Sequence, residues 1–383
     1  LFFESMLSMV WVYIMGCNIV LHVSNAHNVL FYEERVWCQY LHKIEKKLIS
    51  LAEAYKDYFH VGTTISPWTL KYNKTERKLI EKHFNEIVAE NCTKPMFIYK
   101  DENTIDFSTA DKIIKFAQEN NKKLRWHTFV WHNQMPKWIY YKDSECKELA
   151  TKEMLEQRIK KYIQAVMEHT KGIVPSYDVV NEVISDKTFT LRTEEDHSLW
   201  QKIMGPDYVE KVFTWAHEAN PEAELVINDY NIETIPGKRE GMYNFVKDLL
   251  SKNIPVSAIG LQMHISVENP PVSRIEETIQ MFAELGLKVL VTEMDVSVYE
   301  SEKEERKEYT PELLEKQAQR YKELFECFKR CAKKGWLTDV VLWGTQDHLS
   351  WKNNFPVKER TDIPLLFDKD GKAKPAFHKI VEE

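Results

Sequence analysis

The sequence of 383 residues lacks the short motifs by which nucleotide and metal chemistry are usually recognised. It contains no GxGxxG or GKS/GKT sequence, which a doubly wound sheet would normally carry after its first strand to bind phosphate. It also contains no CxxC pair, no HxH pair and no HExxH sequence. A metal-dependent barrel hydrolase using His127, His132, His264 and His348 is therefore an unfavoured alternative, and we expect no metal or other cofactor.

The sequence also has no excess of basic charge and no disulfide framework. Lys and Arg number 52 against 59 Asp and Glu, a formal net charge of −7, so we expect neither nucleic acid nor an anionic membrane as a partner. The six cysteines are scattered through a long chain, unlike those of disulfide-rich domains. Cys327 and Cys331 lie four residues apart on a predicted helix, where small buried hydrophobic residues are the favoured interpretation.

Repeats, low-complexity tracts and Gly/Ser-rich linkers are absent as well. The composition, 43% hydrophobic and 29% charged, is that of a globular protein with ample material for a core. We therefore predict a single catalytic domain over residues 48–383, and a monomer.

The amino-terminal residues leave two interpretations open. An apolar run from Leu7 to Val23, followed by the small residues Ser24 to Ala26, resembles the core of a signal peptide, but no Lys or Arg precedes it. Residues 1–26 are thus either a signal peptide or a mis-annotated extension, and residues 27–47 a helical lead-in. The first alternative predicts a secreted protein and the second a cytoplasmic one. No other stretch has the length of apolar residues needed to span a bilayer.

From residue 48 onward, short runs rich in β-branched residues alternate with amphipathic stretches, which is the pattern of repeated βα units. The predicted strands are Tyr58–Ile65, Glu86–Glu90, Leu124–Trp131, Tyr177–Glu182, Leu225–Asp229, Ala258–His264, Lys288–Glu293 and Val340–Gln346. Helical spacing of apolar residues is seen over Ser108–Asn120, Met154–Thr170, Val209–Asn220, Lys238–Lys252, Ser273–Leu285 and Pro311–Lys334. Eight strands alternating with helices predict the α/β class and a (β/α)8 TIM barrel.

Two glutamates are the candidate catalytic residues. Glu182 and Glu293 each end a short run typical of a strand buried on both faces, where an unpaired charge would be costly. Two carboxylates at the carboxyl ends of different barrel strands are what a retaining glycosidase requires, about 5 to 5.5 Å apart, one as proton donor and one as nucleophile.

Polar and aromatic residues also gather at the predicted ends of the other strands. Asn181 is a neutral donor suited to a sugar 2-hydroxyl, and His264 backed by Asp295 could keep Glu293 ionised. Gln262 would project toward the same pocket. Other candidate substrate-binding residues are polar partners for sugar hydroxyls or aromatic faces for stacking. These are Glu90, Asn91, Lys94, His127, Trp131, Gln134, Tyr230, Trp343 and Trp351.

Several segments together resemble the motifs of glycoside hydrolase family 10, the endo-1,4-β-xylanases. They are WHTFVWHNQMPKW (126–138), DVVNEV (178–183), NDYN (228–231), GLQMH (260–264) and VTEMD (291–295). The resemblance covers nearly all of the chain outside its amino-terminal extension. It implies a retaining enzyme on a (β/α)8 barrel, with Glu182 as acid/base and Glu293 as nucleophile, and with xylan and xylo-oligosaccharides as substrates.

The chain departs from the family pattern in two places. The second predicted strand is followed by Cys92 and Thr93 before Lys94, where the family usually has Glu-Asn-x-Met-Lys. Trp126 stands where a Gly generally precedes the His, and would add a bulky ring beside the pocket wall or just behind it. The first difference would seat Lys94 slightly differently, although its spacing is kept. The second concerns the fit of the substrate and not the chemistry.

Two other functions remain as alternatives to endo-hydrolysis of xylan with retention. A related retaining barrel β-glycanase that acts on glucan or mannan would share the two glutamates. A non-catalytic carbohydrate-binding barrel would keep the aromatic cleft without a working carboxylate pair, and the presence of both glutamates argues against it.

Overall fold

The computed structural model describes residues 9–14, 17–22, 49–143 and 145–381, in two compact units that meet in sequence at Ile49 and Ser50. In the first unit, β1 (Met9–Ile14) and β2 (Cys17–His22) form an antiparallel pair. The predicted signal-like stretch falls partly on these strands, and the predicted helical lead-in over 27–47 lies outside the described residues. Among the described residues, no helix has the length and apolar character to cross a membrane.

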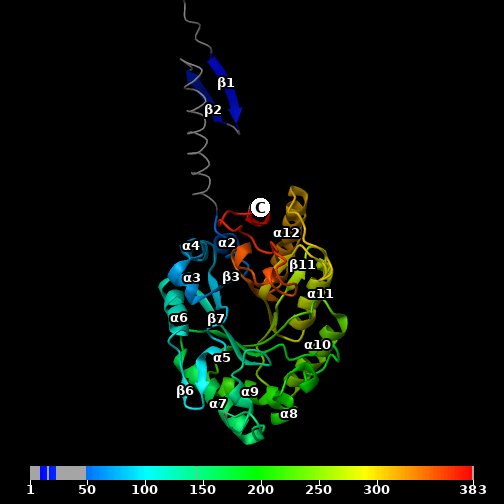
Figure 1. The fold of residues 1–383 in the computed structure, drawn as a ribbon. Helices are drawn as coiled ribbons and strands as arrows, with labels where there is room; N and C mark the ends of the chain where they lie inside the picture. The colour runs from blue at the N-terminus through cyan, green and yellow to red at the C-terminus, as the bar shows by residue number, and fades with distance from the viewer. Residues whose placement is uncertain (1–8, 15–16, 23–48, 144, 382–383) are drawn as a thin grey trace, which may run out of the picture. The chain divides into compact units, whose positions relative to one another are not determined.

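In the second unit, the described residues form a closed barrel of eight parallel strands (Figure 1). The strands are β3 (His60–Ile65), β4 (Glu86–Ala89), β7 (Lys123–Trp131), β8 (Ser176–Asn181), β9 (Glu224–Asp229), β10 (Ala258–Leu261), β12 (Lys288–Ser297) and β13 (Leu337–Leu342). Each strand pairs with the next along the chain, β13 pairs with β3, and the pairing of β10 with β12 completes the ring. The predicted (β/α)8 barrel is confirmed.

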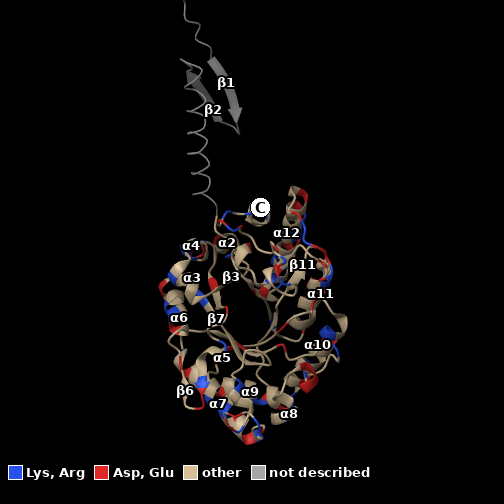
Figure 2. Cartoon of the chain, in the orientation of Figure 1, with Lys and Arg blue, Asp and Glu red and all other residues tan. Residues whose placement is uncertain are grey.

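Helices surround the strands (Figure 1). The α-helices are α2 (Leu51–Ala54), α3 (Pro67–Tyr72), α4 (Lys74–His83), α5 (Pro95–Ile98), α6 (Ala110–Glu119), α7 (Lys152–His169), α8 (Trp200–Met204), α9 (Tyr208–Ala219), α10 (Pro236–Ser251), α11 (Val272–Ala283), α12 (Pro311–Lys333) and α13 (Pro375–Val381). Short 3-10 turns lie at Lys137–Tyr140, Glu194–Asp196, Asp347–Leu349 and Trp351–Asn353, and β5 (Tyr99–Asp101) forms a small hairpin with β6 (Thr104–Ile105). In the view of Figure 2, the positions of basic and acidic residues are interspersed along these helices, in keeping with the charge balance.

Local sequence explains where helices α7 and α12 begin and why β8 is buried. The hydroxyls of Thr151 and Thr310 accept the backbone N–H three residues on and cap α7 and α12, and Pro311 occupies the first turn of α12, where no N–H is needed. Every residue of β8 is buried, as expected for a parallel strand covered by helices. Cys327 and Cys331 are fully buried and free, as the sequence predicts.

Three predicted strands had wrong bounds, each by three or more residues. The sixth strand breaks at Met263, whose φ of 62° interrupts the extended backbone, and resumes as β11 (His264–Ser266). The seventh continues past Glu293 to Ser297 because β11 pairs with its last residues. The eighth spans Leu337–Leu342 where Val340–Gln346 was predicted, because the chain turns away at Gly344, whose φ is 135°.

Candidate active site

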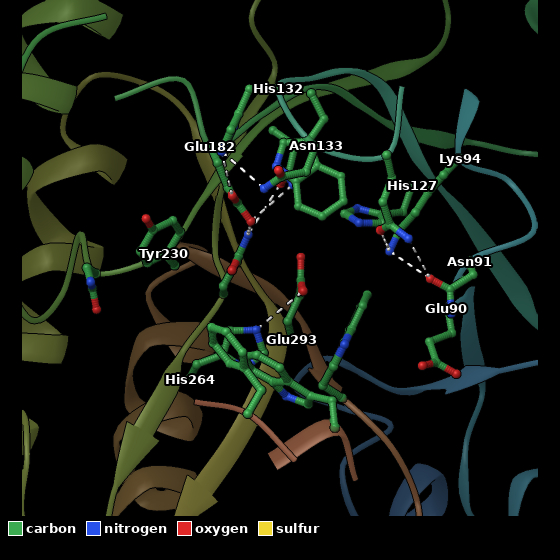
Figure 3. A pocket seen from close by; sticks show the side chains of 18 of the residues that line it. Glu90, Asn91, Lys94, His127, His132, Asn133, Glu182, Tyr230, His264 and Glu293 are labelled. Carbon is green, nitrogen blue, oxygen red and sulfur yellow. Dashed lines mark hydrogen bonds and ion pairs between the residues drawn. The ribbon is translucent and has the colours of Figure 1, made fainter. Parts of the chain in front are cut away.

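A cleft of about 560 Å3 opens at the carboxyl ends of the barrel strands (Figure 3). Every residue predicted for the site lines it except Asp295, which lies behind His264. The structure therefore brings together side chains from seven strands and the loops that follow them. This is the edge at which barrel enzymes place their catalytic groups, because the strands fix the positions while the loops supply the variety.

Glu293 lies inside β12 and is only 4% exposed. Its Oε1 accepts a hydrogen bond of 2.7 Å from the Asn228 amide, and its Oε2 lies 3.4 Å from His264 Nε2. Burial by itself would raise the pKa of this carboxyl. The hydrogen bond and positive charge of His264, aided by the charge of Arg125, outweigh burial and lower the pKa to about 2. Glu293 is therefore ionised at neutral pH.

His264 is held between two carboxylates. Its Nδ1 lies 2.9 Å from Asp295 Oδ2, which also accepts a 2.8 Å hydrogen bond from the Trp351 indole N–H. Burial disfavours the imidazolium, but the charges of Asp295 and Glu293 outweigh it and raise the pKa of His264 to about 9. The protonated ring can donate to both carboxylates at once, which fixes its orientation toward Glu293.

Glu182 has the opposite electrostatic environment. It follows the last residue of β8 with a φ of 56°, and its Oε1 accepts a hydrogen bond of 3.2 Å from the Gln262 amide and one of 3.4 Å from Asn181. Burial and, next, the charge of Asp229 raise its pKa to about 7. A carboxyl with this pKa retains a proton at mildly acidic pH, when Glu293 has already lost its own.

A chain of two amides connects the glutamates. The Asn228 amide nitrogen donates to Glu293 and, at 2.8 Å, to Asn181 Oδ1, while the Asn181 amide donates to Glu182. The Thr292 hydroxyl, at 2.6 Å, fixes the carbonyl end of Asn228. Asn228 is not among the site residues predicted from the sequence. Its place at the end of the fifth strand, in register with Asn181, was the available signal.

Polar side chains on the far side of the cleft from Glu182 and Tyr230 form one cluster (Figure 3). Lys94 donates to Gln134 at 2.7 Å and to Asn91 at 3.1 Å, and its ammonium lies 5.0 Å from the centre of the Trp131 ring. The two residues that precede Lys94 therefore leave it within the cleft. Burial lowers the pKa of Lys94. Glu90, directly after β4, lies beside this cluster.

Residues of the barrel interior contact His127, whose ring in turn contacts that of Trp343. His127 Nδ1 lies 2.7 Å from Asp178, which also pairs with the fully buried Arg125. The ring of Trp343 meets that of His127 edge-on at 5.5 Å. Trp126 is fully buried and is not among the cleft-lining residues, so its bulk lies behind the wall.

Tyr230 is held from behind by two basic side chains. Its hydroxyl accepts a 2.8 Å hydrogen bond from Arg192, and the Lys238 ammonium lies 3.7 Å from the ring centre. Lys238 is fully buried and pairs with Asp229 at 2.8 Å. The ring is thereby fixed on the same side of the cleft as Glu182 (Figure 3).

Comparison with known proteins decides the family. A sequence profile described as Glycosyl hydrolase family 10 matches residues 50–383. The chain belongs to glycosyl hydrolase family 10. The resemblance read from the motifs is confirmed, and with it the expectation that the protein is a glycoside hydrolase.

Relatives in family 10 match over most of this chain. Endo-1,4-beta-xylanase A of Caldicellulosiruptor saccharolyticus is 40% identical, over 88% of this chain and 97% of that protein. Endo-1,4-beta-xylanase C of Paenibacillus barcinonensis is also 40% identical over 88% of this chain, which spans only 32% of that longer protein. A solved structure of GH10 from Paenibacillus barcinonensis superposes with a TM-score of 0.85 at 40% identity, covering 87% of this chain and 97% of that one.

Five further residues line the family 10 cleft that were not predicted as site residues. They are His132, Asn133, Asn231, Lys352 and Phe355. His132 and Asn231 lie next to predicted strand ends, which was a usable signal. Lys352 and Phe355 come from the loop after β13, whose path no local pattern indicates.

In the described ranges, one group of acidic and His side chains has ligand atoms within 4.8 Å of one another, namely His60, Glu86 and Asp339. It lies near the amino ends of β3, β4 and β13, the edge opposite the cleft. Lys123 pairs with both carboxylates there, so an ammonium group of the chain itself offsets their negative charge.

Proposed function

We propose that the protein is an endo-1,4-β-xylanase that hydrolyses internal xylosidic bonds with retention of configuration. The observation that carries the proposal is the pair of carboxyls with opposed protonation, Glu182 with a pKa of about 7 and Glu293 with a pKa of about 2, in one cleft. Environments that push two carboxyls apart in this way assign an acid and a base or nucleophile. The xylanase names of the family 10 relatives support xylan as the polymer.

In the first step, Glu293 attacks the anomeric carbon while Glu182 gives its proton to the glycosidic oxygen, so that the carbon–oxygen bond breaks and the leaving chain departs as an alcohol. A covalent ester joins the remaining sugar to Glu293. In the second step, the ionised Glu182 takes a proton from water, whose oxygen attacks the same carbon and releases Glu293. Two inversions give net retention.

Surrounding residues would position the sugar. Asn181, with its carbonyl oxygen held by Asn228, is the proposed partner of the 2-hydroxyl at the reacting sugar. Glu90, Asn91, Lys94 and Gln134 are the proposed hydroxyl partners of the glycone, and Tyr230 contacts the leaving chain. Trp131, Trp343 and Trp351 offer stacking faces. Substrates are xylan and xylo-oligosaccharides. A solved relative from Thermoanaerobacterium saccharolyticum was crystallised as a mutant with xylotetraose.

The polymer is tested by comparing turnover on xylan, carboxymethyl-cellulose and mannan, with viscosity as a measure of internal cleavage. Xylan is expected to give the highest kcat/KM, with viscosity falling early relative to the release of reducing ends. A clear preference for the glucan or the mannan would overturn the assignment of substrate.

Activity should follow a bell-shaped dependence on pH. The attacking form requires Glu293 ionised and Glu182 protonated, so kcat/KM should rise through about 2 and fall through about 7. The alkaline limb belongs to Glu182, whose proton is lost as the pH rises through its pKa. A rate that stays constant up to about pH 9 would contradict the role of Glu182 as acid.

Replacing His264 should move the acid limb of the pH profile of kcat/KM to higher pH. The His264 hydrogen bond is the largest influence that lowers the pKa of Glu293, so in His264→Ala that pKa should rise from about 2 and the acid limb of kcat/KM should move upward with it. His217→Ala, an exposed histidine on α9, is the matched control. Superimposable pH profiles for His264→Ala and wild type would remove His264 from the proposed support of the nucleophile.

Secretion, a monomeric state and the single domain over 48–383 stay predictions from the sequence. The relative TsXylA from Thermoanaerobacterium saccharolyticum is described as intracellular. Detection of the protein in the culture medium, with the amino terminus read by mass spectrometry, tests the prediction of secretion.

A further inference from the structure

Two large aromatic rings stand exposed on the short helix α3. Trp68 is 54% exposed and Tyr72 is 61% exposed, and their ring centres lie 6.4 Å apart with the planes tilted by 46°. We call this pair the aromatic platform. Residues four apart on a helix lie on the same face, so both rings present themselves outward together. Neither residue is used in the chemistry described above.

The opposite side of α3 is fixed to the barrel. Pro67 occupies its first turn, and the Ser66 hydroxyl accepts the Thr69 N–H at 3.1 Å. Thr69 is 2% exposed and donates a 2.8 Å hydrogen bond to Glu76 on α4. The backbone that carries the platform is therefore fixed, so that binding a ligand requires little ordering of α3.

Two sets of contacts place α3 beside one end of the cleft. The backbone N–H of Glu90, a cleft residue, donates to the carbonyl of Ile65, and Trp68 follows three residues after Ile65. On the other side, Glu76 accepts a hydrogen bond from Thr345, two residues beyond the cleft residue Trp343. These contacts place α3 beside the part of the cleft bounded by Glu90 and Trp343 (α3 beside β3 in Figure 1).

This end of the cleft is the glycone end. Glu182, the proposed proton donor to the leaving chain, and Tyr230 lie on one side of Glu293, while Glu90, Asn91 and Lys94 lie on the other (Figure 3). A chain that extends past Glu90 therefore runs away from the scissile bond toward its non-reducing end.

We propose that the aromatic platform is a remote binding site for the non-reducing part of a xylan chain, on which sugar rings stack after they leave the cleft past Glu90. The inference rests on the proposed function for the identity of its ligand. Xylose rings are uncharged and present C–H faces that aromatic rings bury well. The position of α3 beside the polar cleft favours a polysaccharide over a protein partner, because one extended ligand could contact both.

The test compares long and short substrates in Trp68→Ala and Tyr72→Ala. In both variants, kcat/KM for xylohexaose and for polymeric xylan should fall about tenfold, the effect of about 1.4 kcal/mol of lost ring contact. The rate on an aryl β-xylobioside, which is too short to reach the platform, should stay unchanged. Trp68→Phe should retain most of the activity on xylohexaose. Trp336→Ala, a partly exposed indole at the amino end of β13, is the matched control and should not change the ratio of rates.

Bond-cleavage patterns give a second readout. In Trp68→Ala, cleavage of xylohexaose labelled at its reducing end should shift toward the non-reducing end, because fewer sugars are held on the glycone side. Equal losses of kcat/KM on long and short substrates, or unchanged rates on both, would overturn the assignment of the platform as a binding site and leave the proposed function in place. A wild-type protein that fails to cleave xylan while cleaving another β-glycan would instead overturn the proposed substrate, and the identity of the platform's ligand with it.

Discussion

Glu293→Ala should abolish hydrolysis of xylan, with a fall in kcat of more than about 10^5-fold, because the substitution removes the carboxylate that forms the covalent intermediate. The ionised carboxylate is held by Asn228 and His264 at the centre of the site, and water is a far weaker nucleophile. The measurement is turnover on xylan and on an aryl β-xylobioside, with xylohexaose binding measured by calorimetry.

Added azide should identify the role of Glu293 chemically. In Glu293→Ala, azide can enter the vacated space and attack the anomeric carbon once, so the product should be the α-xylobiosyl azide. Glu224→Ala, a carboxylate at the amino end of β9, is the control and should keep wild-type turnover. Hydrolysis at the wild-type rate in Glu293→Ala, or an azide product of β configuration, would show that Glu293 is not the nucleophile.

Glu182→Ala should lose activity in proportion to how much the leaving group needs a proton. On xylan, kcat/KM should fall by about 10^2- to 10^4-fold, the usual contribution of a positioned general acid. In an aryl xylobioside with an acidic phenol, the phenolate leaves without protonation. The first step should therefore persist and the glycosyl-enzyme should accumulate. Rapid-quench mass spectrometry of the protein detects that ester as added mass.

The products from Glu182→Ala complement those from Glu293→Ala. Azide needs no general base, so it should restore turnover of the accumulated ester and give the β-xylobiosyl azide after two inversions. The alkaline limb near pH 7 should also disappear from the profile, because its titrating group is gone. Equal losses for xylan and the activated substrate would argue against proton donation by Glu182.

The sequence predicts the edge on which the site forms because parallel strands place all their carboxyl ends together. Glu182, Gln262 and Trp343 could therefore be assigned to one cleft without knowledge of any contact. The opposed protonation of the two glutamates could not be predicted in this way. The pKa of Glu182 is raised by burial and by the charge of Asp229, and that of Glu293 is lowered by His264; these surroundings form only when the ring of strands closes.

The features that were missed share a physical cause. Asn228 on β9 contacts Glu293 on β12, with β10 between the two strands, and local periodicity carries no information on contacts between non-adjacent strands. The extension of β12 to Ser297 depends on β11, which exists because the backbone at Met263 takes a left-handed conformation that a non-glycine residue rarely adopts. Phe355 reaches the cleft from a long loop, where no repeating pattern exists to be read.

The central claim is that two unequal carboxyls act in succession on one anomeric carbon. Proton NMR during the first minutes of xylohexaose hydrolysis tests it most directly, because the configuration of the new reducing end is recorded before mutarotation. The β-anomer is expected to appear first and the α-anomer only later. Initial release of the α-anomer would mean a single displacement by water and would contradict the role of Glu293 as nucleophile.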